Sequence, residues 1–222
     1  MSSRRRFLAN GLALGAVAAP NRSAAASGPQ TRPTQRISLD GEWMFRTDPE
    51  DAGEKQNWQA GSQSLNGWRT VMVPHTWQIE APLAEYRGVA WYRREFDTPR
   101  AAAESAVRVE FEAVFHSAKV WINGKPAGEH LRKAYTAFTC DARGLLRDDR
   151  PNVLIVRVDN SFNEHMLPRG RSSDWAHDGG IYRPVALLIT PKTFVERVDV
   201  DALPDLTTGD ARLEIAVFSR NA

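Results

Sequence analysis

Cysteine is scarce in this sequence, which has only one, Cys140, among 222 residues. A single cysteine excludes an intramolecular disulfide, so no covalent cross-link within the chain can hold the fold. Cys140 ends the mainly apolar stretch Ala137–Cys140. We therefore interpret it as a small core residue and not as a reactive thiol.

The sequence also lacks a basic excess outside its first residues. The formal net charge is +2, but the first 26 residues contain Arg4, Arg5, Arg6 and Arg22 and no acidic residue. Without those four charges the remainder carries −2. Because phosphate backbones attract strongly basic surfaces, nucleic acid is excluded as an expected partner.

Long hydrophobic runs are missing as well. The apolar run from Phe7 to Ala19 is too short to cross a bilayer as a helix of about 20 residues, so no stable membrane insertion is expected. Twin arginines precede this run and small residues follow it, which resembles a bacterial twin-arginine export signal over residues 1–26. The alternative is a disordered basic tail. Export of an already folded protein to the periplasm or beyond agrees with the single cysteine.

No amphipathic helix of useful length is predicted, and several chemical signatures are missing. The sequence has no phosphate loop and no dinucleotide fingerprint. Its histidines show no close pairing of the kind that metal ligands adopt, so neither a metal nor a cofactor is expected. The histidines are His75, His116, His130, His165 and His177.

Short strands separated by turns dominate the region from Ile37 onward. Val107–Glu112 alternates apolar and charged residues with period two, as a half-buried strand does. Asn123-Gly124 between two such segments predicts a hairpin, since both residues tolerate positive φ. We expect an all-β, antiparallel domain over residues 37–191, preceded by a linker at 27–36.

Two further alternating segments, Phe194–Val200 and Arg212–Val217, occupy residues 192–222. Two strands cannot bury a sheet face by themselves. Either these strands begin a second domain, which we favour, or they pack on the first one.

Six short segments, read in order, resemble the N-terminal sugar-binding domain of glycoside hydrolase family 2, the family of β-galactosidases and β-glucuronidases. The resemblance implies a jelly-roll β-sandwich, similar to galactose-binding domains, followed by the first strands of an immunoglobulin-like domain. The six segments are Leu39–Phe45, Trp68–Trp77, Gly88–Phe96, Val120–Gly124, Asn152–Asn160 and Gly179–Val185.

The resemblance also implies where the chemistry of such enzymes takes place. Family members use two glutamates on a C-terminal (β/α)₈ barrel, one as acid/base and one as nucleophile. No part of this sequence alternates strand and helix as a barrel does. Asn163-Glu164 looks like the family's acid/base pair, but it lies in a loop of the wrong domain. We therefore assign no catalytic residue and expect a barrel in the same or a separate chain as partner.

The family resemblance points to sugar-binding residues in two loops. An aspartate six residues before the second glycine of the Gly-Ile-Tyr-Arg strand binds sugar hydroxyls in family members, which implies that role for Asp174; the alternative is a turn-forming aspartate. Neighbouring Trp175, His177 and Asp178 are further candidates, although Trp175 is equally compatible with a buried core position. In the loop at residues 80–88 the candidates are Tyr86 and Arg87.

Three functions remain compatible with the sequence. The first is carbohydrate recognition in support of an exported β-glycosidase, with a β-linked sugar as ligand. The second is an independent exported carbohydrate-binding module. The third is a structural domain that docks a catalytic chain.

Overall fold

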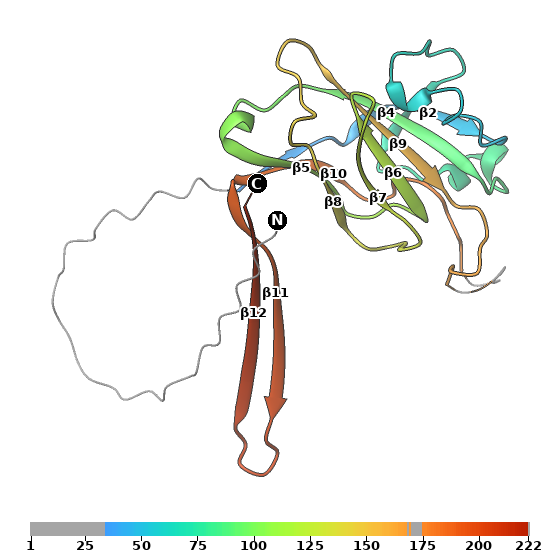
Figure 1. The fold of residues 1–222 in the computed structure, drawn as a ribbon. Coiled ribbons are helices and arrows are strands. Elements are labelled where there is room, and N and C mark those ends of the chain that lie inside the picture. The colour runs from blue at the N-terminus through green and yellow to red at the C-terminus, as the bar shows by residue number, and fades with distance from the viewer. Residues whose placement is uncertain (1–33, 168, 170–174, 222) are drawn as a thin grey trace. The chain divides into compact units, whose positions relative to one another are not determined.

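The computed structural model describes residues 34–167, 169 and 175–221, and these residues are almost entirely β-structure (Figure 1). They divide into two compact units, one formed by Thr34–Ile189 and the other containing the strands after Thr190. The predicted all-β sandwich is confirmed. Among the described residues, none lies in a helix long and apolar enough to cross a membrane.

The strands are short in the first unit and long in the second. They are β1 (Gln35–Ser38), β2 (Gly41–Asp48), β3 (Arg69–Val73), β4 (Val89–Phe96), β5 (Ser105–Phe111), β6 (Ser117–Ile122), β7 (Lys125–His130), β8 (Phe138–Asp141), β9 (Asn152–Asp159), β10 (Val185–Pro191), β11 (Thr193–Pro204) and β12 (Ala211–Asn221). The helical elements are single 3₁₀ turns at Trp58–Ala60, Trp77–Ile79, Ala81–Leu83 and Ala102–Glu104.

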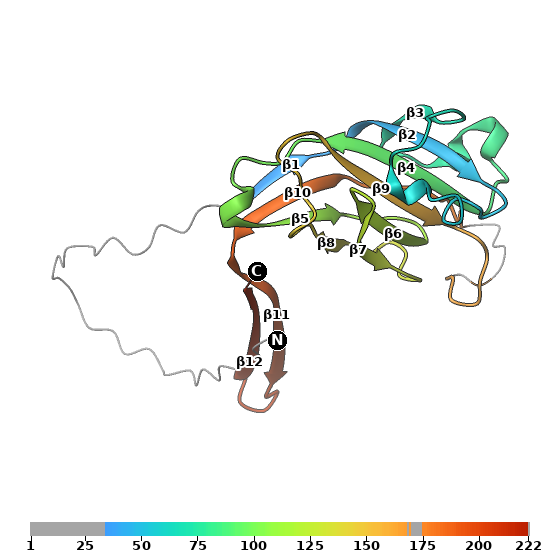
Figure 2. The ribbon, with the colours of Figure 1, turned by 45° about the horizontal axis from the view of Figure 1, so that its top comes forward.

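Two antiparallel sheets form the first unit (Figure 2). One has the strand order β1-β10-β5-β8 and the other the order β3-β2-β4-β9-β6-β7. Neighbours in these orders are mostly distant in the sequence, so the strands cross between layers as in a sandwich and not as in a simple meander. The Asn123-Gly124 hairpin is confirmed: it joins β6 to β7, with φ of 54° and 79° at the two residues.

The main hydrophobic core lies between the two sheets. Tyr92 from β4 and Val156 from β9 meet Phe111 from β5 and Leu187 from β10 in one buried cluster. Each of these side chains is at most 1% exposed, as close-packed interiors require. Cys140 belongs to the same cluster, which confirms its interpretation as a core residue.

The six-stranded sheet is also buried on its outer face. Trp91 and Trp121 alternate along their strands with residues of the main core, so they point to the opposite side, where they stack 5.6 Å apart. The segment after β2 covers them through Trp58. Asp48, only 4% exposed, fixes this cover by accepting hydrogen bonds from Trp91 Nε1 at 2.9 Å and from the main-chain N–H of Gly53 at 2.8 Å.

The sandwich begins earlier than the sequence indicated. Strand β1 starts at Gln35, so residues 35 and 36, assigned above to the linker, belong to the four-stranded sheet. All four residues of β1 are exposed, which explains why no apolar alternation marked it. Main-chain pairing with β10 and the ion pairs of Arg36 with Glu110 and Glu112 hold the strand instead.

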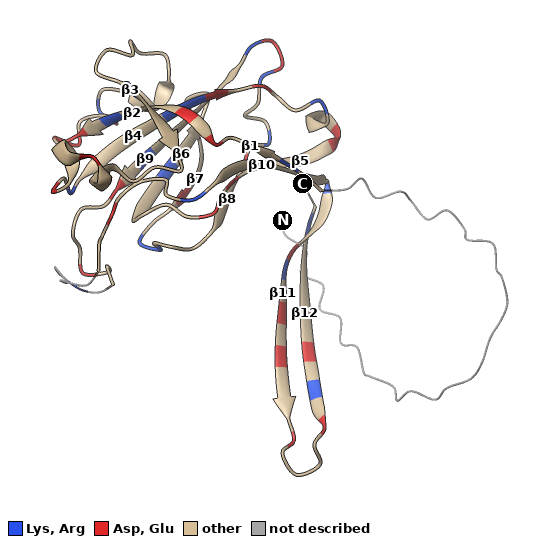
Figure 3. Cartoon of the chain, turned by 180° about the vertical axis from the view of Figure 1, so that it is seen from behind, with Lys and Arg blue, Asp and Glu red and all other residues tan. Residues whose placement is uncertain are grey.

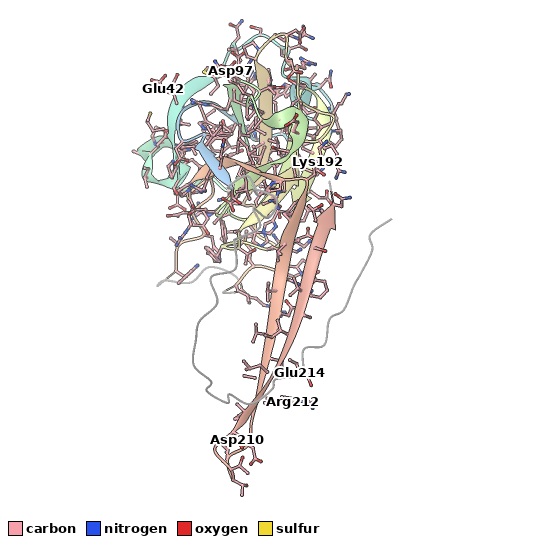
Figure 4. The ribbon with its side chains drawn as sticks, turned by 90° about the vertical axis from the view of Figure 1, so that its left-hand side faces the viewer. Glu42, Asp97, Lys192, Asp210, Arg212 and Glu214 are labelled. Carbon is pink, nitrogen blue, oxygen red and sulfur yellow. The ribbon has the colours of Figure 1, made fainter. Side chains whose placement is uncertain are left out.

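The second unit is a two-stranded ribbon, β11 paired with β12. Directly opposed residues share a face, so the pairs Asp201–Glu214 and Leu203–Arg212 place charges on one side, with Arg212 and Glu214 close to the turn (Figures 3 and 4). The other side is apolar over residues 198–204 and 211–217. It consists of Val198, Val200, Ala202, Leu213, Ile215 and Val217.

A buried hydrogen-bond chain ties the loop after β3 to the core. His75 lies between the Tyr92 hydroxyl and the Glu80 carboxylate, with 2.8 Å to each, and Arg69 pairs with the same carboxylate. Burial lowers the pKa of His75 and outweighs the opposing effect of Glu80. Burial raises the pKa of Glu80, but the hydrogen bonds from Arg69 and His75 hold it below its ordinary value. His75 is therefore a neutral structural residue.

The hydrogen bonds of His75 predict that the folded protein loses stability in acid. Since the pKa of His75 is lower in the folded chain than in the unfolded one, the unfolded state binds more protons as the pH falls below about 6.5, and stability falls with it. We expect His75→Gln to be less stable at pH 7.5 but to lose less stability between pH 7.5 and 5.5 than the wild type. Urea unfolding at both pH values measures this, with the exposed His165→Gln as control. An equal loss in wild type and His75→Gln would contradict the assignment.

The hydrogen bonds that Asp48 accepts beside the Trp91 and Trp121 cluster predict a second position at which substitution destabilises the fold. Asp48→Ala leaves the Trp91 indole and the N–H groups of Ala52 and Gly53 without their acceptor. Unpaired buried donors cost about 1–3 kcal/mol each, so we expect a loss of roughly 3 kcal/mol in the free energy of unfolding. Asp48→Asn keeps an acceptor oxygen and should lose less. Chemical denaturation distinguishes them, and identical losses would show that charge, not hydrogen bonding, is what matters.

Candidate functional site

The candidate site is formed by three segments that contact one another: the loop after Trp77, the segment after Asn160 and the segment from Trp175 to Gly180. Five of the six residues proposed from the sequence are described, and Asp174 lies outside the described residues. The segment from Trp175 leads into Gly180, which forms an isolated antiparallel bridge with Phe115. The loop after Trp77 and the segment after Asn160 adjoin it through the contacts below.

Two glycines let this segment approach the core closely. A Cβ at Gly179 would lie 2.1 Å from Cζ2 of Trp77, and one at Gly180 would lie 2.1 Å from the main-chain oxygen of His75. Gly180 also has a φ of 144°, which side chains disfavour. These two positions therefore admit only glycine, and they fix the direction in which the chain leaves the preceding loop.

Asn160 joins the loops through both ends of its side-chain amide. Its Nδ2 donates to the carbonyl of His177 at 3.1 Å, and its Oδ1 accepts from the N–H of Gly88 at 2.9 Å. The side chain is fully buried, so both bonds form away from solvent. Gln78 adds a third link, because its Oε1 accepts from the N–H of Gly179 at 2.6 Å. The loop containing Tyr86 and Arg87 is thereby tied to the one containing His177.

Trp175 is exposed and ordered by a neighbour. Half of its surface is accessible, so the core alternative raised from the sequence is wrong for this tryptophan. Its Nε1 donates to the hydroxyl of Tyr135 at 2.8 Å, and the two rings stand nearly perpendicular, at 88°. A large exposed indole that is also held in place suits a surface that binds an apolar face of a ligand.

His177 and Asp178 occupy different environments. The His177 side chain is 2% exposed and packs between the rings of Phe115 and Phe162. Its ring therefore lies inside the protein in this structure. Asp178 is half-buried, and its charge helps to raise the pKa of Tyr135, although burial contributes more. Asp178 therefore offers a partly accessible side chain to a ligand, whereas the side chain of His177 does not.

Tyr86 and Arg87 organise their own loop. The Tyr86 hydroxyl donates to the carbonyl of Val89 at 2.5 Å, and burial raises its pKa to about 12. Arg87 donates to the carbonyls of Ala84 and Tyr86, and its guanidinium lies over the ring of Phe162 at 6.0 Å. The Tyr86 hydroxyl is thus engaged within the loop, whereas Arg87 is partly exposed beside an exposed aromatic ring.

Four aromatic residues connect these candidates and were not identified from the sequence. Tyr182 belongs to a quoted motif but was not singled out, and Tyr135 lies 40 residues from its partner Trp175. No local pattern in a single sequence indicates such a pairing. The four are Phe115, Tyr135, Phe162 and Tyr182.

The arrangement is suited to binding a ligand. Exposed aromatic rings and a partly exposed carboxylate can stack on and hydrogen-bond to a polyhydroxylated ligand. Within the described ranges, no cluster of three or more His, Cys, Asp or Glu side chains is placed to hold a metal ion. The described strands also contain no alternating strand–helix units of the kind that build a barrel.

Comparisons with known proteins identify relatives of this chain. A β-galactosidase of Bacteroides ovatus is 32% identical over 166 residues, which cover 70% of this chain and 18% of the relative. A β-glucuronidase of Bacteroides fragilis is 31% identical over 169 residues, covering 74% of this chain and 22% of the relative. The chain thus spans about a fifth of the length of these two proteins.

Solved structures show the same fold. A β-glucuronidase from Ruminococcus gnavus in complex with D-glucuronic acid superimposes with a TM-score of 0.72 at 23% identity, over 88% of this chain and 36% of that one. The model of the glycosyl hydrolases family 2 sugar binding domain matches residues 37–191. Because this match covers more than half of the sequence, the chain belongs to glycosyl hydrolase family 2 and contains its sugar binding domain.

Proposed function

We propose that this chain supplies the sugar-recognition surface of an exported β-glycosidase that acts on β-linked galactosides or glucuronides. The family match over residues 37–191 supports a carbohydrate ligand. Relatives are named as β-galactosidases and β-glucuronidases, which supports the choice of substrate class. The twin-arginine pattern in residues 1–26 supports export.

The observation that carries this proposal is the convergence of candidates from separate loops. Arg87 reaches Phe162, which contacts His177, and the same segment brings Trp175 and Asp178 to the surface. The resemblance adds Asp174, directly before Trp175 in the sequence, as an acceptor for sugar hydroxyls. Charged and aromatic groups on neighbouring loops of a rigid scaffold are a common design for binding sites.

The function of the complete polypeptide is part of the proposal. The chain covers between 16% and 33% of relatives such as a Formosa agariphila and a dog β-glucuronidase, so a catalytic (β/α)₈ domain would come from further sequence or from another chain. The apolar face of the β11–β12 ribbon supports a following immunoglobulin-like domain, because such a face needs a second layer. An independent binding module is the alternative, in which the ribbon would be covered in another way.

The first test concerns sugar binding. Methyl β-glucuronide and methyl β-galactoside are titrated into the 222-residue chain, and millimolar affinity is expected because a shallow site buries little of its ligand. Asp174→Ala should weaken binding at least about tenfold, since a hydrogen bond to a charged group contributes roughly 1.5–3 kcal/mol. The exposed Asp149→Ala serves as the matched control. No heat or chemical-shift change with either sugar would reject sugar recognition by this chain.

The second test concerns the native polypeptide. Its intact mass is measured after recovery from the periplasmic fraction with an antibody to the sandwich. We expect a mass several times that of residues 27–222, accompanied by activity on β-galactosides or β-glucuronides. A mass equal to that of residues 27–222 would instead favour the independent module. Recovery only from the cytoplasm, with residues 1–26 retained, would reject export.

A further inference from the structure

Three aromatic residues from separate segments form a corner at the edge of the candidate site. Tyr135, from the connection between β7 and β8, stands at 88° to Trp175 with 5.8 Å between ring centres, and at 71° to Tyr182 with 6.0 Å. Tyr135 and Trp175 are 44% and 50% exposed. We call these three residues, Tyr135, Trp175 and Tyr182, the aromatic corner.

The aromatic corner rests on a buried residue of the core and on contacts among its own side chains. The ring of Tyr135 packs on Phe115, which is 1% exposed and whose main chain pairs with Gly180. The ring of Tyr182 contacts that of Tyr135, with 6.0 Å between the ring centres. The indole of Trp175 hydrogen-bonds to the hydroxyl of Tyr135 at 2.8 Å. Each ring therefore contacts another ring of the aromatic corner or the core.

The backbone of Tyr135 adopts an unfavourable conformation. Its φ of 52° lies in the left-handed region, which bulky residues rarely occupy and which asparagine or glycine tolerate better. Folding alone would select a small or polar residue at such a turn. A bulky, half-exposed tyrosine at this position, with its hydroxyl bound to a second half-exposed aromatic, indicates a requirement at the surface.

We propose that the aromatic corner is a stacking site for one sugar ring of a β-linked saccharide, with the rings of Tyr135 and Trp175 as the two sides of the site. This inference rests on the proposed function and extends it to Tyr135, which no sequence motif identified. The ring of a β-linked glucuronide carries three axial C–H groups, at C-1, C-3 and C-5, on one face and two on the other, and the face with three packs on the π-face of an aromatic ring. Its equatorial hydroxyls then lie around the edge of the ring, where the half-buried carboxylate of Asp178 is available as an acceptor.

The perpendicular geometry gives the aromatic corner a specificity of its own. One ring covers the apolar face of the sugar, and the second borders the edge, so a bulky axial substituent on the covered face is rejected. Because each aromatic contact of this kind contributes modestly, the loss of either ring should weaken binding roughly threefold to tenfold. The hydrogen bond between Trp175 and Tyr135 orients the rings, and its loss alone should have a smaller effect.

The experiment is saturation-transfer NMR with methyl β-glucuronide on the 222-residue chain, with saturation applied to aromatic protons only. In the wild type, H-1, H-3 and H-5 of the sugar should receive more saturation than H-2 and H-4. Tyr135→Asn removes the ring while suiting the left-handed backbone, and Trp175→Ala removes the second face. Tyr135→Phe keeps the ring without the hydroxyl. Met72→Ala, which shortens an exposed apolar side chain on β3, is the control.

The outcomes separate this inference from the proposed function. The inference holds if Tyr135→Asn and Trp175→Ala each raise the Kd about threefold to tenfold and abolish the one-sided pattern, while Met72→Ala changes neither. It fails, with the proposed function intact, if both ring-removing variants bind as the wild type does while Asp174→Ala loses affinity. Uniform saturation of all sugar protons in the wild type also overturns it, whatever the variants do. Absence of any transfer to the wild type overturns both.

Discussion

The candidate site depends on the close packing of the segment after β3 against Gly179 and Gly180. Because neither glycine has a side chain, the ring of Trp77 and the main chain of His75 reach the backbone of the other segment directly. Main-chain bonds from His75 to Ile181 and from Trp77 to Gly179 complete the contact. A side chain at either glycine would push the two loops apart. The candidate site is therefore shaped by backbone geometry before any candidate side chain contributes.

The same contact explains why the buried polar groups of this region form chains. Strand β4 supplies Tyr92 to the core, and its hydroxyl reaches His75, which in turn holds Glu80 at the start of the neighbouring loop. Asn160 likewise links two segments, because its side chain bonds to the main chain of Gly88 and to that of His177. Buried polar groups stabilise a structure only when each has a partner, so these chains specify one loop arrangement instead of several. Loops that carry a binding surface need that restriction.

The sequence indicated the strands well because half-buried strands alternate locally, as Val107–Glu112 does, and because Asn123-Gly124 permits few conformations. It did not indicate β1, whose residues are all exposed and held by main-chain pairing and by Arg36. It left open whether Trp175 was buried, and it did not find Tyr135. Both depend on a contact between residues far apart in the chain, which periodicity and turn chemistry do not record.

The two units differ in how much of their apolar surface is buried. The six-stranded sheet is covered on both faces, by the main core and by the cluster around Trp91. The β11–β12 ribbon instead has a continuous apolar face in which Val200 and Ile215 are 60% and 46% exposed. Two strands do not sustain such a face in water, so it implies a second layer. The sugar-recognition surface that we propose would likewise form one wall of a site. A single wall buries little of a sugar and binds it weakly, so the proposed surface, like the apolar face of the ribbon, calls for further protein surface to pack against.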